Sequence, residues 1–229
     1  MMRIDILTGL PRLLDSPLQE SILKRAQAKQ LLSLVVHDLR DHTHDKHRTI
    51  DDTPYGGGAG MVLKPEPIFE CVEALRRERS YDEVILMAAD GERFVQAVAT
   101  QLSLKSNLVL ICGHYKGVDE RVREGLVTRE LSIGDFVLTG GELAAAVVVD
   151  AVARLIPGVL NDGESALSDS FQDGLLGSPQ YTRPPEYRGM PVPEELLSGD
   201  HKKIQEWRDR QRLERTKRRR NDLLGGDGI

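Results

Sequence analysis

Short apolar runs rich in β-branched residues alternate with longer helix-period stretches through the first two thirds of the chain. Four of these runs have the length and composition of buried strands, at residues 4–7, 34–36, 84–88 and 108–112. Three longer stretches predict helices, at residues 16–29, 65–79 and 142–155, and the first two carry a Ser-Pro or Pro start signal. Strands that alternate with helices predict an α/β fold with a parallel sheet.

The pattern changes after residue 158. Residues 161–173 are polar and acidic and have no periodicity, which predicts a mobile linker or loop. Residues 178–193 hold five of the eleven prolines, and residues 201–220 predict one helix with ten Lys or Arg against three acids. We therefore predict three parts: an α/β domain at 1–160, a mobile linker at 161–177, and a small basic helical domain at 178–229.

Composition narrows the class of protein. The 229 residues carry a formal net charge of −5, which excludes a chain that is basic throughout, so a nucleic-acid site must be a local patch. The two cysteines, Cys71 and Cys112, lie in apolar segments and suit a reducing compartment. The N-terminus has no apolar leader, and Asp150 and Arg154 interrupt the longest apolar stretch. We expect a cytoplasmic protein without a membrane anchor.

A glycine-rich string follows Tyr55, with glycines at 56, 57, 58 and 60. Glycine lets backbone amides approach a phosphate or a base closely. The string matches neither the P-loop nor the dinucleotide fingerprint, because Met61 and the glycine spacing fit neither pattern. A flexible surface loop is the alternative reading.

A run of histidines and aspartates is the second candidate for chemistry, because these are metal-ligand types: His37, His42, His44, His47, Asp38, Asp41 and Asp45. The run misses the His-x-His-x-Asp-His motif of metal-dependent hydrolases, since Lys46 stands where that motif needs Asp. A solvated loop is the usual meaning of such a run, so we assign no metal ligand.

Two further strings, residues 111–121 and 132–143, place apolar residues between glycines. The first leaves the end of a predicted strand and the second leads into a predicted helix. Together they could form the crevice at the carboxyl ends of parallel strands where α/β proteins bind ligands. Turns that merely need glycine would give the same pattern. The acids of the string 169–176 read, by pattern alone, as solvated.

Taken together, these strings resemble the bacterial tRNA (guanine-N1)-methyltransferases, which methylate the guanosine at position 37, on the 3′ side of the anticodon. The match covers nearly the whole chain, and its specific parts are residues 45–47, 51–52, 54–61, 113, 119–121, 132–143, 150–160, 169–176 and 181–184. Several long strings in the same order are more specific than any single glycine motif.

The resemblance implies a SPOUT-type α/β domain with a deep C-terminal trefoil knot, followed by the small helical domain. Periodicity alone would have drawn an unknotted sheet, since chain connections rarely thread loops. The resemblance also implies an obligate homodimer with active sites at the interface, tRNA as the partner, and a role in reading-frame maintenance. S-adenosylmethionine is the implied methyl donor. A dependence on Mg²⁺ is also plausible from the family, with no assignable site.

The resemblance assigns residues to the two ligands. The implied cofactor contacts are Leu86, Met87, Ala88, Gly113, Tyr115, Ile133, Gly134, Asp135, Phe136, Val137, Leu138, Gly140 and Gly141. The implied tRNA contacts are Tyr55, Gly56, Gly57, Gly58, Gly60, Ser165, Arg183 and Arg218. The glycine string would be a wall for a guanosine flipped out of its stack, and the basic helix would follow the tRNA backbone.

Two residues receive catalytic roles by position. Asp169 is the implied general base for the N1 proton, and Arg154 is the cation that stabilises the deprotonated guanine. N1 of guanine is a weak acid, so a carboxylate base needs help, and a cation near O6 supplies it. An (i, i+4) pair with Asp150 is the structural alternative for Arg154.

The sequence departs from the family pattern at two places, and three alternative functions remain open. It has Ala-Ala-Asp-Gly at 88–91, where relatives commonly have Ser-Pro-Gln-Gly, and Gly177 where an acid is common. The rivals are a SPOUT enzyme for another RNA position or a ribose hydroxyl, a metal-dependent hydrolase that uses the histidine run, and a non-catalytic RNA-binding module. Asp169 argues against the ribose version.

Overall fold

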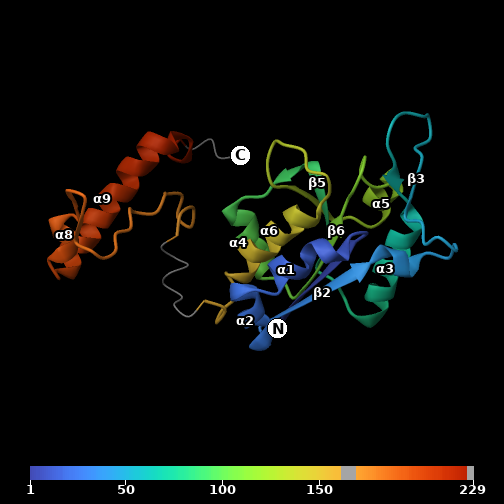
Figure 1. Ribbon diagram of the computed structural model, residues 1–229, viewed down its shortest axis with the longest axis horizontal. Coiled ribbons are helices and arrows are strands. Elements are labelled where there is room, and N and C mark those ends of the chain that lie inside the picture. The colour runs from blue at the N-terminus through green and yellow to red at the C-terminus, as the bar shows by residue number, and fades with distance from the viewer. Residues whose placement is uncertain (161–168, 226–229) are drawn as a thin grey trace. The chain divides into compact units, whose positions relative to one another are not determined.

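The computed structural model describes residues 1–160 and 169–225 of the chain. The chain divides into two compact units, Met1–Asn161 and Asp162–Ile229. Figure 1 shows the first unit as a helix-covered sheet and the second as a helical unit built around one long helix.

A five-stranded parallel sheet forms the centre of the first unit, in the order β2-β1-β6-β5-β7. The strands are β1 (Met2–Thr8), β2 (Leu32–Asp38), β5 (Glu83–Arg93), β6 (Asn107–Cys112) and β7 (Arg129–Ser132). The prediction of an α/β fold with a parallel sheet is confirmed, as are the four predicted strands. Strand β7 was not predicted, because its sequence Arg-Glu-Leu-Ser has no apolar run.

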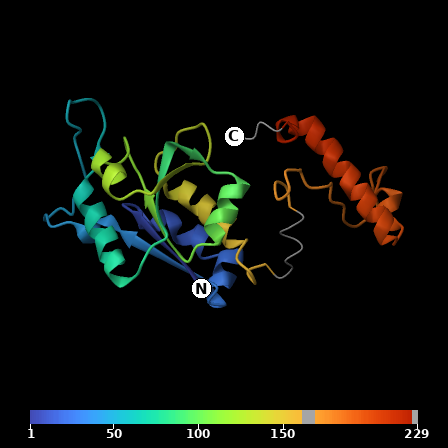
Figure 2. The same ribbon diagram turned by 180° about the vertical axis from the view of Figure 1, so that it is seen from behind.

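Helices cover both faces of the sheet (Figures 1 and 2). One core packs 3₁₀-helix η1 (Pro11–Leu14), α1 (Asp15–Leu18), α2 (Ser21–Ala28), α4 (Gln96–Ser103) and α6 (Glu142–Ala153) against it. The other packs η2 (Leu39–His42), α3 (Pro65–Glu78) and α5 (Glu120–Gly125) against the opposite face. Alternation along β1 supplies both cores, since Ile4 and Ile6 join the first and Leu7 the second. The predicted helices at 65–79 and 142–155 are confirmed to within two residues at their ends.

The helix predicted at 16–29 is wrong in one respect, because the chain breaks it into α1 and α2. Glu20 has an extended backbone, and Ser21, the first residue of α2, adopts a φ of +50°, which lies outside the right-handed helical region. The break turns the chain so that both Leu18 and Leu23 are buried. The Gln27 side chain donates a hydrogen bond of 2.9 Å to the carbonyl of Leu18 and closes the gap.

A buried carboxylate, Asp5, lies in β1 on the same side of the strand as Leu7. It accepts hydrogen bonds from the Arg3 guanidinium at 2.7 and 2.8 Å and from the Tyr81 hydroxyl at 2.7 Å. The Nε2 atom of His37 lies 2.7 Å from it. Burial alone would raise the pKa of Asp5, but these hydrogen bonds outweigh burial and hold the pKa well below its ordinary value.

Replacing Asp5 by asparagine should remove an acid-sensitive part of the stability. Because the folded-state pKa lies below the unfolded value, the stabilisation is present above about pH 4 and is lost as the pH falls below it. We expect Asp5→Asn to lower the free energy of unfolding by about 3 kcal/mol at pH 7, and by less at pH 3. Urea unfolding at both pH values measures this, with exposed Glu124→Gln as control. An unchanged loss at pH 3 would contradict the assignment.

The second unit is built around helix α9 (His201–Arg219), which begins at Asp200, whose side chain accepts hydrogen bonds from the backbone N–H of Lys202 and Lys203. The helix predicted at 201–220 is therefore confirmed to within one residue. A short helix α8 (Glu194–Leu197), a hairpin of β8 (Glu186–Tyr187) and β9 (Met190–Pro191), and η3 (Asn221–Leu223) complete the unit. In the described part of the chain, no helix is long and apolar enough to cross a membrane.

Candidate functional site

A pocket of about 290 Å³ lies where β5, β6 and β7 end. Three segments line it: residues 86–90 of β5, where its pairing with β6 ends, residues 113–118 after β6, and residues 131–134 and 136–141 from the end of β7 to α6. Arg123 of α5 and Ala144 of α6 complete the lining. The pocket is at the carboxyl ends of parallel strands, the edge at which α/β sheets bind ligands.

The loop after β6 and the loop between β7 and α6 are joined by backbone contacts. The N–H of Gly141 donates a 2.8 Å hydrogen bond to the carbonyl of Gly113, and His114 forms an isolated antiparallel bridge with Gly140. A Cβ at position 141 would lie 2.9 Å from Cα of Cys112, closer than real Cβ atoms approach. The absence of a side chain at Gly141 therefore lets α6 begin directly against the end of β6.

Strand β5 bulges beside the pocket, because its pairing with β7 shifts between Met87 and Glu92. A Cβ on Gly91 would lie 2.7 Å from the carbonyl carbon of Glu130, so the bulge requires glycine at that point. The bulged residues 88–90 line the pocket. The Ala-Ala-Asp-Gly string thus departs from the family pattern while keeping the glycine that the close approach needs.

The pocket contains most of the predicted cofactor residues: Leu86, Met87, Ala88, Gly113, Tyr115, Ile133, Gly134, Phe136, Val137, Leu138, Gly140 and Gly141. Asp135 is not among the lining residues. Sequence reasoning included His114 only as part of the predicted cofactor loop 113–115, and it did not single out Lys116 or Arg123. Lys116 lies inside a string that was already noted, whereas Arg123 is placed by its ion pairs with Glu130 and Asp90, which no motif reveals.

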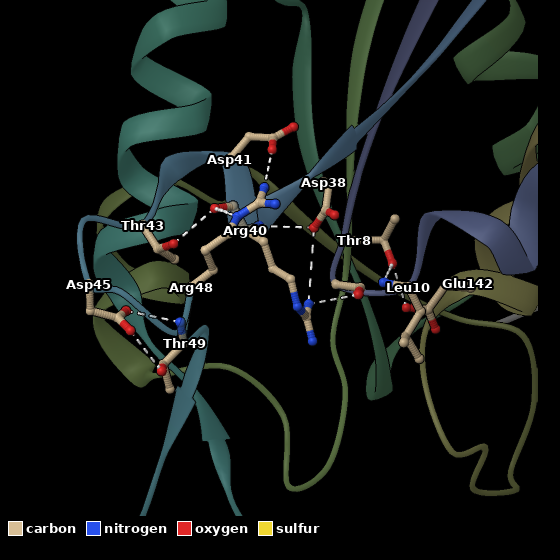
Figure 3. Close-up of polar contacts among 11 residues, drawn as sticks. Thr8, Leu10, Asp38, Arg40, Asp41, Thr43, Asp45, Arg48, Thr49 and Glu142 are labelled. Atoms are coloured by element: carbon tan, nitrogen blue, oxygen red, sulfur yellow. Dashed lines mark hydrogen bonds and ion pairs between the residues drawn. The ribbon is translucent and has the colours of Figure 1, made fainter.

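A buried carboxylate lies behind the pocket at the first position of α6. The Thr8 hydroxyl donates a 2.6 Å hydrogen bond to Glu142 and accepts one from the N–H of Leu10 (Figure 3). Thr8 and Glu142 are both buried, and a carboxylate is favourable at a helix N-terminus. Burial, with the charge of Glu142, raises the pKa of the neighbouring Cys112 thiol, so Cys112 stays protonated.

The glycine string forms the tip of a hairpin, β3 (Asp51–Asp52) with β4 (Val62–Leu63). Gly56, Gly57, Gly58 and Gly60 all have positive φ, and Tyr55 is fully exposed. Backbone hydrogen bonds of 3.0 Å attach the hairpin to the pocket wall, from Lys116 N–H to the Met61 carbonyl and from Leu63 N–H to the Gly117 carbonyl. The base of the hairpin is thereby attached next to the pocket, while a Cβ on Gly56, Gly57 or Gly58 at its tip would meet nothing within 4 Å.

The histidine run has structural partners. His37 contacts Asp5, and His44 lies 2.9 Å from the Glu70 carboxylate. Figure 3 shows the segment that follows β2, where Asp38 accepts from the Arg40 N–H and Arg48 pairs with Asp41. In the described ranges, 1–160 and 169–225, no group of three or more His, Cys, Asp or Glu could hold a metal ion.

Comparison with known proteins identifies the family. A model of the tRNA (Guanine-1)-methyltransferase TrmD family matches residues 2–226. The chain belongs to the tRNA (guanine-1)-methyltransferase family.

Several relatives share this similarity over almost their whole length. The chain is 59% identical to the tRNA (guanine-N(1)-)-methyltransferase of Bacteroides fragilis, over 97% of this chain and 99% of the relative. It is 61% identical to the protein of that name from Cytophaga hutchinsonii, over 97% and 94%. For the Dehalococcoides mccartyi protein of the same name the identity is 57%, over 97% and 90%.

In this member of the tRNA (guanine-1)-methyltransferase family, the predicted catalytic residues come from different units. Arg154 is the C-terminal capping residue of α6 in the first unit, and Asp169 is a half-buried residue at the start of the described part of the second. Arg183 and Arg218 are exposed residues of the second unit, and Arg183 lines a second pocket beside Tyr181. Ser165 lies outside the described residues.

Proposed function

We propose that this protein transfers a methyl group from S-adenosylmethionine to N1 of guanosine 37 in tRNA. The observation that carries the proposal is the pocket at the ends of β5, β6 and β7, which is lined by the strings that resemble the family. The relatives named above, all tRNA (guanine-N(1)-)-methyltransferases, support the same reaction. Methylation beside the anticodon would serve reading-frame maintenance in the cytoplasm.

The pocket residues fit S-adenosylmethionine. The bare backbone at Gly113, where a Cβ would meet nothing closer than 3.8 Å, leaves room for a flat ring against the strand ends, and Leu86, Ile133 and Leu138 give it apolar walls. When bound, S-adenosylmethionine supplies a methyl group on a positively charged sulfur. The residues of this chain hold and orient it and exclude water from the reacting atoms.

The knot and the dimer are part of the proposal. The knot is proposed from the resemblance to the family, and it would bring residues 140–141 against residues 113–114, where the structure has a backbone hydrogen bond and a bridge. A homodimer with its active sites at the interface is supported by apolar side chains exposed around the pocket and on α6, with exposures of 53% for Phe136, 87% for Val137, 56% for Leu143 and 49% for Val147. Leu143 and Val147 are four residues apart and therefore lie on one face of α6, and exposed apolar faces mark protein–protein contact sites.

The chemistry assigns one role to each catalytic candidate. N1 of guanine is nucleophilic only after it loses its proton, so Asp169 is proposed to accept that proton as the methyl group arrives. A carboxylate is too weak a base by several pKa units, at about 1.4 kcal/mol each, and the Arg154 guanidinium is proposed to stabilise the charge that develops on the ring. A direct pair between the two would lower the pKa of Asp169, so Arg154 is proposed to face the guanine.

The tRNA contacts follow from the same reading. The glycine string with Tyr55 is proposed to receive the flipped guanosine, because it is attached to the wall of the pocket. Ser165 and Arg183 are proposed to contact the anticodon loop. Arg218, exposed on the last turn of α9, is proposed to contact backbone phosphates with the other cations of that helix.

Transfer of labelled methyl from S-adenosylmethionine to a tRNA transcript tests the proposal. We expect label on a transcript with guanosine at positions 36 and 37, and none when adenosine replaces guanosine 37. Repeating the assay with EDTA tests the proposed dependence on Mg²⁺. Equal labelling of both transcripts would contradict the substrate assignment. A folded protein that labels neither transcript would contradict the reaction.

A further inference from the structure

One face of helix α9 binds the segment 170–177, which directly follows Asp169 in the chain. The Arg212 guanidinium lies 2.5 Å from a carboxylate oxygen of Asp173. One turn later, the hydroxyl of Thr216 accepts a 2.9 Å hydrogen bond from the backbone N–H of Leu176. Residues four apart lie on the same face of a helix, so both contacts belong to one surface.

The same segment is closed on itself and has a third contact with the end of α9. The N–H of Phe171 donates to the carbonyl of Leu175 at 2.8 Å, and the N–H of Gly177 donates to the Ser170 hydroxyl at 2.8 Å. The guanidinium of Arg220 lies 5.7 Å from the centre of the Phe171 ring, within cation–π range. The segment is closed by its own hydrogen bonds and contacts α9 at three points. It is therefore held at one position on the helix.

Burial and charge distinguish these contacts from ordinary surface pairs. Thr216 is fully buried, and its hydroxyl also donates to the carbonyl of Arg212 at 2.7 Å. The side chain of Arg212 is only 17% exposed, although it belongs to a highly charged helix. Its hydrogen bond lowers the pKa of Asp173, so the pair remains charged at neutral pH.

We propose that Arg212 and Thr216 are positioning residues that hold the 170–177 segment on α9 and thereby fix the place of Asp169. The inference rests on the proposed function, because it concerns the residue proposed there as the base. In this reading α9 has two tasks. Its exposed cations bind the tRNA backbone, and its buried face carries the segment that leads to the base.

The alternative interpretation is that Arg212 contacts a phosphate of the tRNA backbone, like the exposed cations of α9. The two readings predict different results for its partner, because Asp173→Asn breaks the pair and leaves the Arg212 cation in place. A phosphate contact would be strengthened or unchanged by that substitution. A positioning contact would be weakened, and a misplaced base slows the chemical step with little effect on tRNA binding.

The experiment measures kcat and KM for tRNA in the full-length protein, with Arg212→Gln, Asp173→Asn and the double variant. We expect each single substitution to lower kcat by about 10- to 100-fold, with KM changed less for Asp173→Asn. The double variant should be no slower than the slower single variant, since both remove one interaction. Arg210→Gln removes the same charge from the same helix, where Arg210 pairs with Glu195 of α8, and its effect should be confined to KM.

A second pair of variants keeps the test valid if the charged variants unfold. Thr216→Ser retains the hydroxyl and should keep kcat near the wild-type value, whereas the isosteric Thr216→Val should lower kcat. Thermal unfolding of each variant separates loss of the fold from loss of position.

Three results would overturn the inference. They are an unchanged or faster kcat in Asp173→Asn, additive effects in the double variant, or a kcat in Thr216→Val equal to that of Thr216→Ser. Failure of the proposed function is separate, because it would appear as a wild-type protein that does not methylate guanosine 37, or as full activity in Asp169→Asn.

Discussion

Asp169→Asn is expected to lower kcat for methylation of guanosine 37 by about 10²- to 10⁴-fold, the usual contribution of a positioned general base. Asparagine has nearly the same shape as aspartate, but its amide cannot accept the N1 proton. The residual rate should rise about tenfold per pH unit between pH 7 and 9, because the reaction then depends on guanine that has already lost its proton. Single-turnover methyl transfer on the tRNA transcript measures both effects.

The control for Asp169→Asn is cofactor binding. Titration calorimetry should give a Kd for S-adenosylmethionine within about twofold of the wild-type value, since Asp169 is not among the residues that line the pocket. A variant with wild-type kcat would remove Asp169 from the mechanism and leave the reaction itself unaffected.

Gly141→Ala is expected to damage the pocket from within. Its Cβ would lie 2.9 Å from Cα of Cys112, 3.0 Å from Cβ of Met87 and 3.1 Å from the backbone nitrogen of Gly113. Two of these atoms are backbone and cannot rotate away, so α6 must shift. Overpacking of this kind costs about 1–3 kcal/mol, and an equal loss of binding free energy would weaken S-adenosylmethionine affinity by about 5- to 150-fold.

Gly113→Ala is the matched comparison. A Cβ at position 113 would meet its nearest atom, the Met87 carbonyl oxygen, at 3.8 Å, which is an ordinary contact. We therefore expect the melting temperature to fall for Gly141→Ala and to stay near the wild-type value for Gly113→Ala. Calorimetric Kd values and melting curves of both proteins test this. Equal cofactor affinity in wild type and Gly141→Ala would contradict the role given to the close approach.

The fold could be predicted wherever burial leaves an apolar run. Strands β1, β5 and β6 are buried on both faces and are therefore visible in the sequence, and the edge strand β2 still carries the apolar run at residues 34–36. Strand β7 lies at the edge of the sheet, and only Leu131 and Ser132 in it are buried, so hydrophobic pattern misses it. The break before α2 was also hidden, because the positive φ of Ser21 leaves no signal in residue type.

The sequence showed which segments form the site, but it did not show which of their residues contact one another. The segments that line the pocket stand out because they place apolar residues between glycines, and their resemblance to the family supplied the roles. The reason for each glycine came only from the structure. Gly91 and Gly141 are needed by close backbone approaches to residues about 40 and 30 positions away. The pair between Asp173 and Arg212 was invisible for the same reason, since nothing in the sequence says which cation meets which acid.

The strand order determines when the parts of this protein come together during synthesis. Strand β1 is made first, yet it lies between β2 and β6, and its pairing with Asn107–Ile111 joins residues about 100 positions apart. Contacts of such long range make folding slow, because the chain must close a large loop before they form. The pocket needs residues as late as Ala144. A nascent chain that ends before α6 therefore has all five strands of the sheet available and no complete pocket.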